Sequence, residues 1–91
     1  MMYKVVYAPK AERGLVMLHR DDPKAYKKAL QLIAELYEHP RTGTGKPELL
    51  SRDQAGRWSR RISQKHRLIY EIHDKEVMVL VLTTYGHYSD K

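Results

Sequence analysis

The residues that could do acid–base chemistry gather in the second half of the chain. Glu48 is the only carboxylate between Glu38 and Asp53, and a carboxylate near cations can still act as a base. His87 carries an imidazole, which titrates near neutrality and can therefore supply a proton. Tyr88 follows directly, and a phenol can stack on a nucleobase or hold a phosphate oxygen. Each of these side chains, taken alone, also fits an ordinary surface or chain-end position.

Two arginines are expected to face each other across a β-hairpin. Alternation along two predicted strands places Arg61 and Arg67 on the same side of the sheet. A three-residue connection over 63–65 pairs Arg61 with Arg67, whereas a two-residue connection pairs Arg67 with Ile62; we predict the longer connection. Like charges repel in such a position, so a clamp for phosphate explains the pair better. Two solvated arginines remain the alternative interpretation of this pair alone.

The chain lacks the patterns of common metal and cofactor sites. It has no cysteine, and its five histidines do not have the close spacing of a zinc motif. The glycines of residues 43–46 form too short a segment for a phosphate-cradling loop. We therefore expect no cofactor and no metal. RNA needs neither, because its own 2′-hydroxyl can attack the adjacent phosphate when a base, cations and an acid are supplied.

Hydrophobic periodicity predicts the elements that would position these residues. It indicates a strand, two helices and four further strands, over residues 3–7, 9–20, 23–39, 47–50, 58–62, 66–72 and 76–85. Asp22 before Pro23 is typical of a helix start, and the last strand is apolar on both faces, which suits a central position. We predict a single α+β domain over residues 1–91, with an antiparallel sheet and the helix hairpin packed on one face.

Length and charge restrict the possible partners. The 91 residues carry a formal charge of +6, which favours a polyanionic partner such as nucleic acid or an acidic protein segment. No apolar run approaches the roughly 20 residues of a membrane span, and the N-terminus lacks the apolar segment of a signal peptide. We expect a cytoplasmic protein with no membrane partner.

Four short segments resemble a known family when they are taken together. They read Gly45-Lys46-Pro47-Glu48, Trp58-Ser59-Arg60-Arg61-Ile62, His66-Arg67-Leu68-Ile69-Tyr70 and His87-Tyr88. Their order and spacing resemble the YoeB/Txe branch of the RelE toxin superfamily, while the first 40 residues share only its layout of a strand and a helix hairpin. Two features differ: Gly86 stands where an aromatic residue commonly precedes the histidine, and residues 89–91 extend the chain beyond Tyr88.

The resemblance implies a RelE-like fold and a toxin of a type II toxin–antitoxin system. Such a toxin is a ribosome-dependent, metal-independent endoribonuclease that cleaves mRNA in the A site and stops translation. Its partners would be the ribosome, mRNA and a cognate YefM/Axe-like antitoxin, and a homodimer is possible. Carried over residue by residue, the family roles make Glu48 the general base, His87 the general acid, Arg67 the phosphate-stabilising cation, Arg61 and Lys46 its supports, and Tyr88 the residue that positions the substrate.

Two other functions stay open on the sequence. A non-nuclease toxin on the same scaffold, like the ParE proteins that poison DNA gyrase, would not need the set of Glu48, Arg67 and His87. A plain RNA-binding module would hold phosphates on its basic face without cutting. The four resembling segments, found together in this order, favour the nuclease over the gyrase poison and the RNA-binding module.

Overall fold

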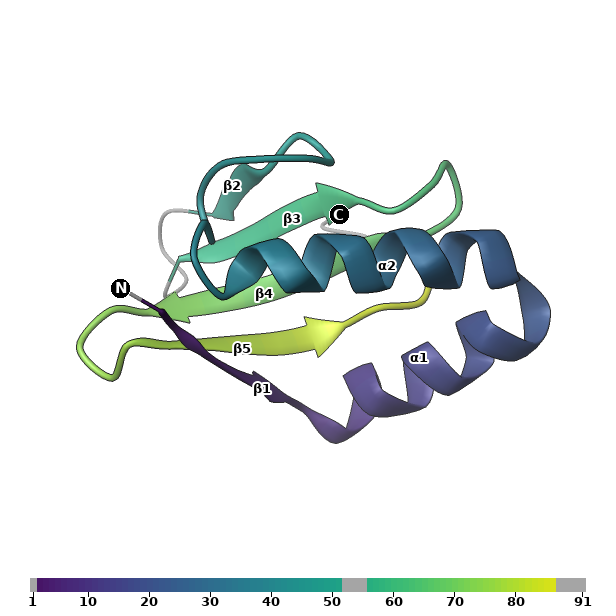
Figure 1. Ribbon diagram of the computed structural model, residues 1–91, viewed down its shortest axis with the longest axis horizontal. Helices are drawn as coiled ribbons and strands as arrows, with labels where there is room; N and C mark the ends of the chain where they lie inside the picture. Colours follow the sequence, from purple (N-terminus) through teal and green to yellow (C-terminus); the bar gives the residue numbers. More distant parts are fainter. Residues whose placement is uncertain (1, 52–55, 87–91) are drawn as a thin grey trace.

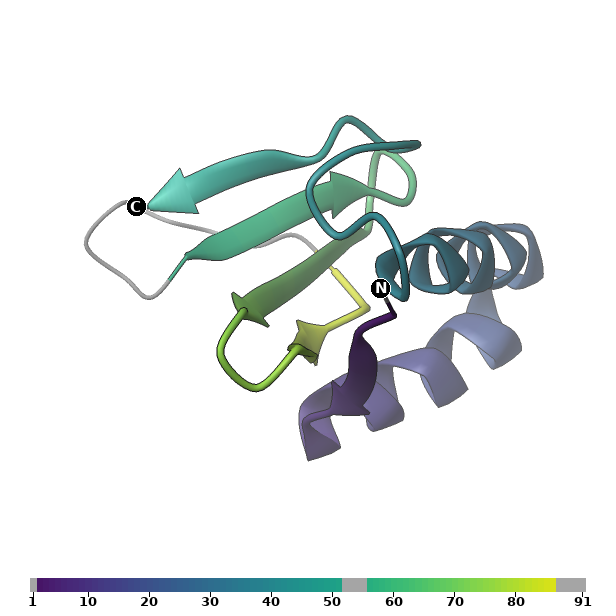
Figure 2. The same cartoon turned by 60° about the vertical axis from the view of Figure 1, so that its left-hand side comes forward.

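The described part of the chain folds as two helices packed on one five-stranded sheet (Figure 1). The computed structural model describes residues 2–51 and 56–86. In chain order the elements are β1 (Lys4–Tyr7), α1 (Pro9–Asp21), α2 (Pro23–Leu36), β2 (Glu48–Ser51), β3 (Arg57–Arg61), β4 (Arg67–His73) and β5 (Met78–Thr83). The spatial order of the strands is β1-β5-β4-β3-β2. Figure 2 shows both helices on the same side of the sheet, so the predicted α+β class with a helix hairpin on one face is confirmed.

The sheet is mixed rather than wholly antiparallel. β1 pairs with β5 in parallel, with Val5 beside Val79, while every other neighbouring pair is antiparallel. Only strands joined by a tight hairpin must run antiparallel, and the whole chain from α1 to β4 separates β1 from β5. β5 lies between β1 and β4, which confirms the inner position predicted from its apolar residues.

The helix hairpin turns at Asp22. Its carboxylate accepts a hydrogen bond from the Ala25 amide at 3.2 Å, and its own amide donates to the Leu18 carbonyl at 2.8 Å. One residue therefore closes α1 and caps α2, as expected for an aspartate before a proline. α2 ends at Leu36, earlier than the predicted end near His39, although the His39 amide still bonds back to the Glu35 carbonyl at 2.7 Å.

The core lies between the helices and one face of the sheet. It is formed by buried side chains of α1, α2, β4, β5 and the residue after β3, namely Ala11, Leu18, Ala25, Ala29, Leu32, Ile33, Leu36, Ile62, Leu68, Tyr70, Val79 and Val81. Within the described residues, no helix is long and apolar enough to cross a membrane.

Gly14 lets α1 approach the end of β5. A β-carbon built at Gly14 would lie 2.3 Å from the hydroxyl oxygen of Thr84, a distance that side chains do not reach. The Thr84 hydroxyl is buried and donates to the Ala11 carbonyl at 2.8 Å. A glycine that weakens the helix on propensity alone is therefore explained by close packing against the chain segment that follows β5.

Candidate functional site

The open face of the sheet carries the predicted base and the two predicted cations. Arg61 is paired with Arg67, as expected for the longer hairpin connection. Glu48 is paired with Ser59, two residues before Arg61. Paired residues and alternate residues share a face, so the four side chains lie on the side away from the core residues Leu68 and Tyr70. Lys46 precedes β2 and is exposed.

Ser59 lies at the centre of this group. Its side chain is buried, and its hydroxyl is 3.4 Å from a guanidinium nitrogen of Arg67, which is long for a hydrogen bond. Glu48 approaches the same serine from β2. The serine therefore stands between the predicted base and the predicted phosphate-binding cation, a position that the sequence interpretation left without a role.

The two ends of the β3–β4 ladder differ in charge. At one end Arg57 is paired with Glu71, and their charged atoms are 3.7 Å apart. At the other end Arg61 is paired with Arg67, and neither guanidinium has a carboxylate within ion-pair distance among residues 2–51 and 56–86. The second end is therefore a concentrated positive charge, which suits a phosphate group.

The segment before β2 is docked on β3. The Arg61 amide donates to the Gly45 carbonyl at 2.7 Å. Gly45 has a φ of +85°, and a β-carbon there would lie 3.1 Å from the Arg61 carbonyl oxygen. Lys46 follows with a φ of +52°, an unusual backbone conformation for a lysine. The docked backbone places the start of the Lys46–Glu48 segment beside the arginine pair.

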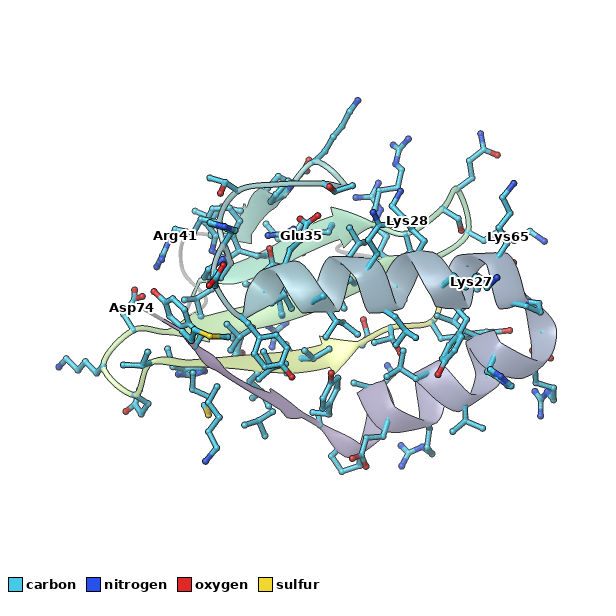
Figure 3. All side chains as sticks on the ribbon, in the orientation of Figure 1. Lys27, Lys28, Glu35, Arg41, Lys65 and Asp74 are labelled. Atoms are coloured by element: carbon cyan, nitrogen blue, oxygen red, sulfur yellow. The ribbon has the colours of Figure 1, made fainter. Side chains whose placement is uncertain are left out.

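A buried arginine holds the loop that leads into this segment. Arg60 has no exposed surface, and its guanidinium donates to Glu35 at 2.7 Å and to the Tyr70 hydroxyl at 3.0 Å. It also donates to three loop carbonyls, those of His39 at 2.5 Å, Thr42 at 2.8 Å and Thr44 at 3.3 Å. We call Arg60, Glu35 and Tyr70 the loop clamp; Figure 3 shows Glu35 reaching from α2 toward this loop.

The environment of the loop clamp shifts two pKa values. Burial alone would raise the pKa of Glu35, but hydrogen bonds from Thr44 and Arg60 outweigh it and lower that pKa. Burial raises the pKa of Tyr70, whose hydroxyl donates to the Pro40 carbonyl at 2.7 Å. In the clamp an ionised Glu35 carboxylate therefore accepts from the Arg60 guanidinium, with the neutral phenol of Tyr70 beside them.

A second set of contacts holds the segment after β5. The Gly86 amide donates to Nδ1 of His66 at 2.8 Å, and the Gly86 carbonyl accepts from the Arg67 amide at 3.0 Å. We call His66 and Gly86 the tail anchor. Gly86 has a φ of +85°, and a β-carbon built there would meet no heavy atom of the described residues within 4 Å, so backbone conformation accounts for a glycine here. His87 and Tyr88 lie outside the described residues.

Two of these positioning residues were missed by sequence reasoning. Arg60 alternates with Arg61, so its place on the core face was available from the pattern, and a charged residue on that face indicates a buried partner. His66 stands in one of the segments that resemble the toxin family, but the sequence predicts no role for it. Nothing local marks it, because its partner Gly86 is 20 residues away in sequence.

Comparison with known proteins identifies the family. Residues 7–88 match the model of the YoeB-like toxin of bacterial type II toxin–antitoxin systems. This chain belongs to that YoeB-like toxin family. A curated relative, toxin YoeB of Mycobacterium bovis, is 38% identical over 79 residues, which are 87% of this chain and 93% of the relative.

Solved structures of YoeB-like toxins have the same fold. A YoeB/ParE toxin from Agrobacterium tumefaciens is similar with a TM-score of 0.83 and 33% identity, over 93% of this chain and 99% of that one. A YoeB dimer from Staphylococcus aureus is similar with a TM-score of 0.80 and 28% identity, over 97% and 100%. A heterotetrameric YoeB–YefM toxin–antitoxin complex from the same organism gives a TM-score of 0.77 and 28% identity, over 97% and 100%.

Proposed function

We propose that this YoeB-like toxin is a ribosome-dependent endoribonuclease that cleaves mRNA in the A site by metal-independent acid–base chemistry. The observation that carries the proposal is the grouping of Glu48, Arg61 and Arg67 on the open face of the sheet. Cleavage at a phosphate requires a base and positive charge on one surface, and this surface offers Glu48 and two arginines that form no ion pair with a carboxylate of the described residues. A non-nuclease toxin has no use for this combination.

The residues divide the reaction among them. Glu48 accepts the proton of the 2′-hydroxyl, and the freed oxygen attacks the adjacent phosphorus. Arg67 stabilises the negative charge that develops on the phosphate oxygens, with Arg61 and Lys46 beside it. The bond to the 5′-oxygen breaks, and His87 donates a proton to that leaving oxygen. The products are a 2′,3′-cyclic phosphate and a 5′-hydroxyl, and no oxidant, metal or cofactor enters the balance.

Two parts of the proposal extend beyond the described residues. His87 and Tyr88 are included on the strength of the sequence, as general acid and as the residue that positions the substrate. The Gly86 carbonyl accepts a hydrogen bond from the Arg67 amide at 3.0 Å, so the residue before His87 in the sequence lies beside the strand that carries Arg67. This connection supports the assignment of His87 because an acid must stand close to the leaving oxygen.

We also propose the partners and the setting of this toxin. A YefM/Axe-like antitoxin would bind and silence it in the cytoplasm, as the Staphylococcus aureus YoeB–YefM complex suggests for this family. The Staphylococcus aureus YoeB dimer supports self-association of this chain as well. The net charge of +6 suits both the ribosome and an acidic antitoxin segment.

Primer extension on mRNA bound to purified ribosomes tests the activity. Wild type should create new 3′ ends in the A site, and Arg67→Ala should reduce cleavage by about 10²- to 10³-fold, the usual cost of removing a charge-stabilising donor. Glu48→Ala and His87→Ala should also lose cleavage. Arg57→Ala is the matched control, because it removes an arginine of the same strand pair that has its own carboxylate partner.

Each alternative function predicts a different result. If no protein creates new ends while the wild type still arrests growth and induces DNA damage signalling, the toxin is a gyrase poison of the ParE kind. If the wild type binds programmed ribosomes and leaves mRNA intact without arresting growth, it is an RNA-binding module. Equal cleavage by Arg67→Ala and Arg57→Ala would refute the assignment of the open-face cations.

A further inference from the structure

We propose that His66 is a positioning residue for the proposed reaction, which holds Gly86, the residue before His87 in the sequence, beside Arg67 through Nδ1. This inference rests on the proposed function, since it concerns how the general acid reaches the phosphate site. His66 itself does not face the reaction. The residue is 6% exposed and lies at the corner where the segment after β5 meets the start of β4.

The tautomer of His66 follows from its partner. A backbone amide can only donate, so Nδ1 of His66 must accept the bond from Gly86 and carries no proton. In the neutral ring the proton therefore sits on Nε2. That atom is 3.9 Å from the Asp22 carboxylate, which favours a proton on this side. The turn of the helix hairpin thus helps to keep Nδ1 available for Gly86.

The surroundings of His66 fix the plane of its ring. The Tyr85 ring packs on it with 4.6 Å between centroids. The Tyr85 hydroxyl donates to Asp21 at 3.1 Å, which ties the same segment to the helix hairpin. Aromatic packing on one side and the Asp22 carboxylate on another leave the imidazole little rotational freedom. A fixed ring gives the bond to Gly86 a defined direction.

Gly86 couples this anchor to the proposed active site. Its amide bonds to His66 and its carbonyl bonds to the Arg67 amide, so the peptide groups on both sides of one residue are held. Residue 87 begins one bond beyond that carbonyl. A residue held on both sides cannot drift relative to Arg67, and catalytic groups lose efficiency when they are displaced by about 1 Å. His66 therefore controls the position of Gly86 relative to Arg67 and does not bind the substrate.

Two substitutions separate the hydrogen bond from the rest of the side chain. His66→Asn places its amide oxygen where Nδ1 stands, whereas His66→Gln places that oxygen where Nε2 stands. We expect His66→Gln to lower the single-turnover cleavage rate on programmed ribosomes by about 10²-fold while ribosome affinity and melting temperature stay close to those of His66→Asn. His66→Asn should keep most of the rate. In His66→Gln alone, the Gly86 amide should exchange faster with solvent.

A spectroscopic measurement on the wild type does not depend on any variant folding. Long-range nitrogen–proton correlation spectra of ¹⁵N-histidine protein should show His66 with its proton on Nε2. A proton on Nδ1, or equal cleavage by the asparagine and glutamine variants, overturns the inference. His87→Ala measured in parallel keeps the two ideas apart: an active His87→Ala contradicts the proposed function, whereas an inactive His87→Ala with a fully active His66→Gln contradicts only the role of His66.

Discussion

Arg60 and Arg61 are neighbours on β3 and have opposite surroundings. Arg60 is fully buried and donates to Glu35, to a tyrosine hydroxyl and to three loop carbonyls. Arg61 is exposed on the other face, paired with Arg67. The first guanidinium is buried, so protein groups must supply all of its hydrogen bonds. The second residue is exposed, so its charge stays available to a ligand.

The difference shows how one strand serves stability and chemistry at once. Arg60 orders the loop that delivers Lys46 and Glu48, while Arg61 contributes charge to the surface where they arrive. Substitution of Arg60 should therefore change mainly the free energy of unfolding. Substitution of Arg61 should change mainly the charge of the open face.

The largest effect is expected from breaking the loop clamp. Arg60→Leu removes five hydrogen bonds, to Glu35, Tyr70 and three loop carbonyls, and leaves Glu35 with Thr44 as its remaining donor. At about 0.5–1.5 kcal/mol for each lost bond, the variant should lose about 3–5 kcal/mol. Chemical denaturation measures the free energy of unfolding. Arg61→Leu, at the next residue, is the control and should change it little. Equal destabilisation by the two variants would show that the clamp has no special role.

A smaller effect is expected when only the charge of Glu35 is removed. Glu35→Gln keeps the shape but loses a charged hydrogen-bond acceptor, which costs about 1.5–3 kcal/mol at neutral pH. Because the folded-state pKa of Glu35 is lowered, its contribution is present at neutral pH and is lost as the pH falls through that pKa. The difference in stability between wild type and Glu35→Gln should therefore disappear as the pH is lowered. Melting temperatures of both proteins from neutral to acidic pH check this, and a difference in melting temperature that does not depend on pH would contradict it.

The smallest expected effect is a change in stability whose sign differs between the two ends of the β3–β4 ladder. Arg61→Gln relieves repulsion from Arg67 and should raise stability by about 0.2–1 kcal/mol. Arg57→Gln removes the partner of Glu71 and should lower stability by a similar amount. In about 1 M salt the change at Arg61 should shrink because exposed charges are screened, and the change at Arg57 should shrink less because Arg57 and Glu71 are partly buried. Changes of the same sign would mean that side-chain packing, not charge, dominates at both positions.

Local pattern was sufficient for the order of the elements and for the faces of the residues in β3 and β4. Alternation placed Arg61 and Arg67 together, and the length of the hairpin connection set their register. Asp22 before Pro23 predicted the helix cap that the structure contains. These features depend on residues close in sequence, whose geometry is restricted by period and turn length. The catalytic roles of Glu48, Arg67 and His87 stay predictions.

Only the tertiary structure decided how the predicted site is held. The parallel pairing of β1 with β5, the loop clamp between residues 25 apart and the tail anchor between residues 20 apart all join distant parts of the chain. A sequence pattern states which face a side chain takes but not which partner it meets there. Arg60 and His66 acquire their partners only when the helices, the loop and the end of β5 close around them, because burial requires each polar group to find a complement wherever the fold supplies one.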